Sequence, residues 1–206
     1  LLFLLGSAFG VFAFFSPGHS SPLLRLEDAS MPGGIYLMLP IAPTKRGQTV
    51  LFCPGQYQSR LVARLTGESG YCSGGSTALV KTLVALPGDS VTIDSTGVYV
   101  NGLLLPNSRP LQHTSDGRPV SYYPFNQSLD EGWCLTMSLY NPRSVDSRYF
   151  GPVKCHQLWR ALPLSKRPRT FEQQIASLFT AMPRAYATGA ESLPARTSTP
   201  VGGTVH

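Results

Sequence analysis

The decisive stretch of the sequence is TALVKTLVAL, which covers Thr77–Leu86 and ends before a Pro-Gly pair. Its β-branched and apolar residues predict a buried strand, and the Pro-Gly pair predicts the turn that ends it. Alternation along a strand places Lys81 on one face between Leu79 and Leu83. Lysine is rarely fully buried without a partner, so Lys81 is the first candidate for a functional residue.

Shorter strands are predicted on both sides of this one. They cover Val50–Cys53, Val91–Ile93, Val98–Val100, Trp133–Tyr140 and Val153–Leu162. Asp94–Gly97 predicts a hairpin turn, whereas the polar stretches Gln56–Thr77 and Asn107–Leu129 predict loops. Gly and Pro make up 20 and 18 of the 206 residues, which favours many turns and argues against a helical bundle. The predicted fold is mainly β, an antiparallel sandwich or partly open barrel.

The N-terminus predicts a membrane anchor. Residues 1–15 form an uncharged apolar run, and we expect this run to be truncated at its start. A spanning helix needs about 20 apolar residues, whereas shorter runs are typical of buried helices and signal peptides. No A-x-A-like cleavage site follows directly, which favours an uncleaved transmembrane anchor over a cleaved secretory signal. Residues 16–28 then form a polar connector to a domain on the far side of the membrane.

The basic charge is concentrated in the C-terminal tail. The formal net charge is +6, but residues 160–206 hold 6 Lys and Arg against 2 Asp and Glu, which leaves 11 against 9 for residues 1–159. A basic tail rather than a basic folded surface argues against nucleic-acid binding. Within the tail (residues 165–206), apolar residues at helical spacing and a capping-box pattern predict a helix over Thr170–Met182.

Four cysteines favour an oxidising compartment. They are Cys53, Cys72, Cys134 and Cys155. Pairing them in chain order closes two loops of about 20 residues, each worth about 3 kcal/mol in the chain-entropy model. Three connectivities are possible, and buried free thiols remain an alternative. No C-x-x-C pair is present, so we expect no zinc site.

Lys81 has two interpretations. Its stem can lie along an edge strand with the ammonium in water. Alternatively, desolvation favours the neutral amine, which can then act as a general base towards a serine hydroxyl. Ser30 is the candidate nucleophile, since Ser30–Gly34 (SMPGG) suits a tight, exposed turn whose backbone N–H groups face a developing oxyanion.

The order of these motifs resembles the signal peptidase I superfamily of Ser/Lys proteases. An apolar anchor precedes Ser-Met-Pro (30–32), the strand with Lys81 precedes Pro-Gly-Asp (87–89), and SVDSRYFGPV (144–153) resembles the late S-x-D-S-R-x-x-G box of that family. The Cys-Pro after the first strand, GVYVNG (97–102) and DSRYFGPV (146–153) are most similar to the conjugative-transfer, TraF-type signal peptidases. The resemblance covers residues 1–164 and implies a signal peptidase-like β-domain over residues 29–164.

The resemblance also implies a role for each matching residue. Ser30 matches the nucleophile and Lys81 the general base. Ser144 matches the hydroxyl that bonds the lysine amine, and Asp146 matches the box aspartate, paired with Arg148. One position departs from the general family: Asp28 stands where a small hydroxyl residue donates to the oxyanion, and an ionised carboxylate cannot donate.

What the family does sets the functional expectation. The resemblance implies a membrane-bound serine endopeptidase of the bacterial inner membrane, with its catalytic domain in the periplasm. The implied substrate is an exported pilin or mating-pore precursor, which some family members also cyclise. The Ser/Lys mechanism needs no cofactor or metal. The departure at Asp28 leaves a second hypothesis open, a non-catalytic periplasmic assembly factor of a conjugation or secretion apparatus.

Overall fold

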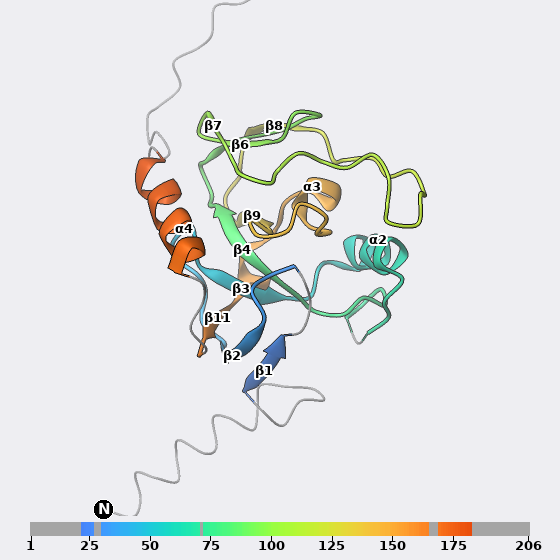
Figure 1. The fold of residues 1–206 in the computed structure, drawn as a ribbon, viewed down its shortest axis with the longest axis horizontal. Coiled ribbons are helices and arrows are strands. Elements are labelled where there is room, and N and C mark those ends of the chain that lie inside the picture. Colours follow the sequence, from blue (N-terminus) through green and yellow to red (C-terminus); the bar gives the residue numbers. More distant parts are fainter. Residues whose placement is uncertain (1–21, 27–29, 71, 165–168, 183–206) are drawn as a thin grey trace, which may run out of the picture.

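The computed structural model describes residues 22–26, 30–70, 72–164 and 169–182 (Figure 1). The predicted anchor (1–15), Asp28 and most of the C-terminal tail lie outside these ranges. Within the described part of the chain, no helix is both long and apolar enough to cross a membrane.

The larger of two antiparallel sheets has seven strands in the order β1-β2-β11-β3-β4-β9-β10. Their bounds are β1 Leu23–Leu26, β2 Gly34–Leu39, β3 Thr49–Phe52, β4 Leu79–Ala85, β9 Trp133–Met137, β10 Val153–Lys154 and β11 Trp159–Pro163. The mainly β prediction is thereby confirmed. Two details are corrected. Leu23–Leu26, inside the predicted connector of residues 16–28, pairs with β2 as an edge strand. The predicted last strand is split, because the 3-10 turn η1 (Cys155–Gln157) separates β10 from β11.

Strand β4 carries Lys81 through the middle of this sheet. All seven of its residues are buried, and it lies between β3 and β9 rather than at an edge. Val50 of β3 pairs with Lys81, and Met137 of β9 pairs with Thr82. The edge-strand interpretation of Lys81 is therefore wrong, since neighbouring strands cover β4 on both sides.

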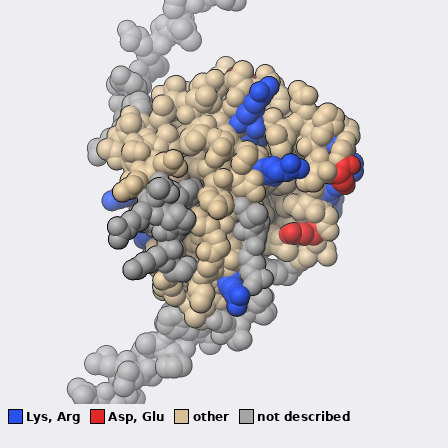
Figure 2. All heavy atoms as spheres, in the orientation of Figure 1, with Lys and Arg blue, Asp and Glu red and all other residues tan. Residues whose placement is uncertain are grey.

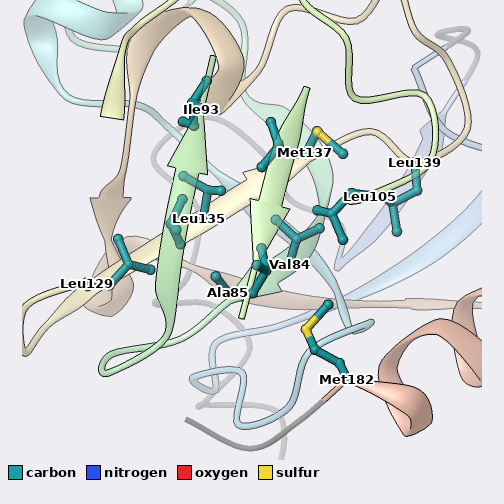
Figure 3. Packing of buried hydrophobic residues seen from close by; sticks show 12 residues of the cluster. Val84, Ala85, Ile93, Leu105, Leu129, Leu135, Met137, Leu139 and Met182 are labelled. Atoms are coloured by element: carbon teal, nitrogen blue, oxygen red, sulfur yellow. The ribbon is translucent and has the colours of Figure 1, made fainter. Parts of the chain in front are cut away.

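The smaller sheet has four strands in the order β7-β6-β5-β8. They are β5 Ser90–Ile93, β6 Val98–Val100, β7 Leu103–Leu104 and β8 Phe125–Ser128. The predicted hairpin is confirmed, because Val91 pairs with Val100 and Ile93 with Val98. The buried residues of the hairpin join those of β4 and β9 in one apolar cluster that connects the two sheets (Figure 3).

Helix α2 (Gln56–Thr66) replaces the first half of a predicted loop. The Gln58 side chain accepts a hydrogen bond from the Gly55 N–H at its start, and Gly67 ends it with φ 73°. The loop prediction over Gln56–Thr77 was wrong for residues 56–66, because the Gly residues and most of the Ser residues that suggested a loop lie in residues 67–77.

Helix α4 (Arg169–Ala181) confirms the predicted helix in the tail. Ile175, Leu178 and Phe179 pack against the cluster between the sheets, and Met182 is buried in it. Figure 3 shows Met182 at the end of this helix, next to Val84 and Ala85 of β4. The packed unit therefore extends beyond Leu164.

All four cysteines form disulfides in chain order, Cys53 with Cys72 and Cys134 with Cys155. The first bridge ties the segment after α2 to the end of β3. The second ties η1 to β9. The free-thiol alternative is thereby excluded, and one of the three possible connectivities is selected.

Candidate active site

Lys81 is buried in the sheet and held by a serine. Only 1% of its surface is exposed, and its Nζ donates to Ser144 Oγ at 2.7 Å. An ammonium in such a place has lost its hydration, and this penalty favours the neutral amine. The predicted contact between Ser144 and the lysine amine is thus present in the structure.

Ser30 begins a turn that is anchored at three successive residues. Its carbonyl oxygen accepts a hydrogen bond from Ser138 Oγ. Met31 Sδ accepts one from Thr82 Oγ1 at 3.8 Å, and the Pro32 carbonyl accepts one from Tyr36 Oη at 2.5 Å. Ser30 itself is 8% exposed. The turn is therefore fixed to the sheet, and the expectation that it is exposed was wrong.

These anchors bring the turn to the part of β4 that carries Lys81. Thr82, the residue after Lys81, contacts Met31, the residue after Ser30. Thr82 also pairs with Met137, the last residue of β9. Ser138 follows Met137 in the chain and donates its hydroxyl hydrogen bond to the Ser30 carbonyl. Directly paired residues of antiparallel strands have Cα atoms about 4.5–5.5 Å apart. The Ser30 turn therefore lies against β4 at Thr82, the residue next to Lys81.

Asp146 and Arg148 form a fully buried ion pair. The Arg148 Nε and Nη2 atoms donate to the two carboxylate oxygens of Asp146, each at 2.8 Å, and both side chains are 0% exposed. Asp146 also caps helix α3 (Ser147–Phe150) by accepting from the Arg148 backbone N–H at 3.2 Å. Such a bidentate pair fixes both side chains in one geometry.

This ion pair holds both candidate catalytic regions. Arg148 Nη2 donates to the Ser144 carbonyl at 2.8 Å, next to the hydroxyl that bonds Lys81. Asp146 Oδ2 accepts from the Ser138 N–H at 3.0 Å, next to the hydroxyl that bonds Ser30. The remaining guanidinium nitrogen, Nη1, donates to the carbonyls of Asn107 and Pro142. One buried pair therefore sets the relative position of the two serines that contact the predicted dyad.

The contact with Asp146 favours the protonated form of Arg148. Burial alone would lower the pKa of Arg148, but the adjacent Asp146 carboxylate outweighs it and the net pKa is raised. Burial also raises the pKa of Tyr149, although the Leu111 N–H bonded to its hydroxyl opposes that shift. On the face seen in Figure 2, basic side chains are isolated from one another and most of the surface is uncharged.

The five predicted site residues thus fall in one region. Ser30, Lys81, Ser144, Asp146 and Arg148 are all at most 8% exposed and are linked through the contacts given above. Sequence reasoning missed Ser138 and Thr82. Thr82 had a signal, since it follows Lys81 on the decisive strand. Ser138 had none, since it lies at the end of a predicted strand without a recognised motif.

Comparison with known proteins identifies the family. The model of the family "Signal peptidase, peptidase S26" matches residues 3–160. The chain belongs to the signal peptidase family S26. A plasmid transfer protein TraF of Escherichia coli is 38% identical over 132 residues, which cover 63% of this chain and 74% of that protein. A conjugal transfer protein TraF of Agrobacterium tumefaciens (strain 15955) is 31% identical over 156 residues, 74% of this chain and 87% of the relative.

These matches confirm the resemblance to TraF-type members of the family. The crystal structure of a signal peptidase I from Enterococcus faecalis V583 also matches, with 25% identity and a TM-score of 0.33. That match covers 57% of this chain and 95% of the other.

Proposed function

We propose that this S26 protein is a serine endopeptidase in which Ser30 is the nucleophile and Lys81 the general base. The observation that carries the proposal is the burial of Lys81, 1% exposed inside β4 with its amine on Ser144. A solvated lysine stays protonated at neutral pH and cannot accept a proton. Burial of the amine favours the neutral form that the reaction requires.

The proposed reaction uses groups of this chain alone. The neutral Lys81 amine takes the proton of the Ser30 hydroxyl while Oγ forms a bond to the scissile carbonyl carbon. Backbone N–H groups of the Ser30 turn stabilise the resulting oxyanion. The carbon–nitrogen bond then breaks, and Lys81 returns the proton to the leaving amine. Water, or the amino terminus of the substrate in a cyclising enzyme, attacks the acyl-enzyme with Lys81 again as base.

The proposed substrate and location follow the relatives. The names of these relatives concern plasmid and conjugal transfer. We therefore place the protein in the bacterial envelope, anchored in the inner membrane by residues 1–15, with the described domain in the periplasm. Two disulfides within the domain support an oxidising compartment. The proposed substrate is an exported pilin or mating-pore precursor of the same transfer system.

Processing of that precursor tests the proposal. Membranes that contain the wild-type protein, Ser30→Ala or Lys81→Met are incubated with the precursor, and the product mass is measured. Both variants are expected to lose processing, because general-base removal alone costs about 10²–10⁴-fold. Lys45→Met, which changes an exposed lysine, is the control and should process normally. Substantial processing by either site variant overturns the dyad and favours the non-catalytic assembly factor.

The pH profile gives a second test. If burial keeps the amine neutral, activity reaches half of its maximum at a pH well below the value of about 10.4 that is ordinary for lysine. Ser144→Ala removes the hydroxyl on that amine and should move the profile. A wild-type profile that still climbs near pH 10 contradicts a buried lysine base.

A further inference from the structure

Ser138 is a buried serine with a fully used hydroxyl. It is 0% exposed. Its Oγ donates to the Ser30 carbonyl and accepts from the N–H groups of Tyr140, at 3.3 Å, and Asn141, at 2.9 Å. A serine hydroxyl has one donor and two acceptor sites, so all three are occupied. The two N–H groups thus fix the direction in which the single O–H points.

The backbone of Ser138 is fixed as well. Its N–H donates to Asp146 Oδ2, and Asp146 is held in turn by the guanidinium of Arg148. Arg148 also holds the carbonyl of Ser144, whose hydroxyl bonds Lys81. A continuous series of hydrogen bonds therefore runs from the Ser30 carbonyl through Ser138 and the ion pair to the amine of Lys81.

We propose that Ser138 is a positioning residue that sets the place of Ser30 relative to Lys81 by holding the Ser30 carbonyl. This inference rests on the proposed function. The held oxygen is two bonds from the Cα that carries the reactive side chain, so fixing it limits movement of the hydroxyl. A displacement of about 1 Å at a reacting group can cost about 10²-fold in rate. The other two anchors of the turn act on Met31 and Pro32, whereas Ser138 contacts the nucleophile residue itself.

Ser138→Ala tests this role, with Ser108→Ala as a matched control. Ser108 is also buried, at 2% exposure, and its hydroxyl donates to the Leu105 carbonyl and accepts from the Val98 N–H, beside the smaller sheet. Both variants lose a buried hydroxyl that donates to a carbonyl and accepts from the backbone, so both are expected to lower Tm. Precursor processing is measured well below both melting temperatures.

The expected result is a fall in kcat of about 10–100-fold for Ser138→Ala, at unchanged KM, and wild-type kinetics for Ser108→Ala. The pH of half-maximal activity should stay at the wild-type value in Ser138→Ala, because the contact of Lys81 with Ser144 is untouched. Equal kcat values in the two serine variants overturn the proposal. A fall that lies in KM, or a displaced pH profile, also overturns it.

Conservative variants separate the hydroxyl from the fold. Ser138→Thr keeps the O–H and is expected to recover most of the rate, whereas a folded Thr variant as slow as Ser138→Ala contradicts the proposal. Where Ser138→Ala does not fold, Ser138→Cys takes its place, since a thiol is a weaker donor of similar shape. Failure of the proposed function can be distinguished from failure of the positioning role, because Ser30→Ala would process the precursor normally only if the proposed function is wrong. If Ser30→Ala is inactive and Ser138→Ala is normal, only the positioning role fails.

Discussion

Replacing Arg148 by methionine should destabilise the domain more than any ordinary surface substitution. The guanidinium makes five side-chain hydrogen bonds, two to Asp146 and one each to the carbonyls of Asn107, Pro142 and Ser144. Methionine fills a similar volume but offers no donor. The substitution therefore leaves a buried carboxylate without its counter-ion and three carbonyls without this partner.

The magnitude follows from those losses. Removing one member of a buried ion pair costs about 3–5 kcal/mol, and each unsatisfied buried carbonyl adds to it. Domains of this kind have a total stability of about 5–15 kcal/mol. Arg148→Met is therefore expected to lose about 3–5 kcal/mol of unfolding free energy, or to fail to fold. Arg148→Lys keeps the charge but not the bidentate geometry, so it should lose less.

Urea unfolding with the disulfides intact measures the effect. Arg118→Met is the matched control, because Arg118 pairs with Asp116 at the same spacing of two residues. In this pair, however, the Arg118 side chain is 50% exposed and the Asp116 side chain is 59% exposed. That exposed pair should contribute little measurable stability. The double variant Asp146→Leu with Arg148→Met should lose less than the sum of the single variants. If Arg148→Met costs no more than Arg118→Met, the ion pair does not organise this site.

Three further predictions concern the rest of the domain. Gly47→Ala should lower Tm more than Gly102→Ala. Both glycines have positive φ, but a Cβ at Gly47 would meet helix α4 at 3.0 Å, whereas one at Gly102 would meet nothing within 4 Å. Equal losses of Tm would contradict the docking of α4. Replacing Cys134 and Cys155 by alanine should cost about 3 kcal/mol in urea unfolding, and an unchanged midpoint would refute a stabilising bridge. Burial raises the pKa of Tyr149, so as pH rises the unfolded chain loses the phenolic proton at a lower pH than the folded protein does. The free energy of unfolding should therefore fall as pH rises above 10, and it should fall less in Tyr149→Phe. Parallel plots of unfolding free energy against pH for the two proteins would contradict this.

The central strand and the buried contacts of the candidate site could be predicted because each has a local signature. The β-branched run around Lys81 predicts a strand wherever its partners lie, and the box from Ser144 to Arg148 is a short contiguous motif. The resemblance to the family was enough to predict the contacts of Lys81 with Ser144 and of Asp146 with Arg148.

Features that depend on tertiary contacts could not be predicted. Helix α2 is a different case, because residues 56–66 hold neither Gly nor Pro and could have been separated from the Gly- and Ser-rich residues that follow. Strand β1 exists because it pairs with the edge of β2, which a polar, Pro-containing stretch does not indicate. Ser138 acquires its importance from Ser30, which is 108 residues away in the chain, and no spacing within the sequence reports that contact.

The most direct measurement of the Ser/Lys dyad is the mass of the peptide that carries Ser30 after reaction with a serine-directed acylating probe. The account predicts one adduct on Ser30 in the wild-type protein and none in Ser30→Ala. It also predicts labelling slowed by about 10²-fold or more in Lys81→Met, with Lys45→Met unchanged. Labelling of Ser30 at the wild-type rate in Lys81→Met, or labelling confined to other serines, would contradict it.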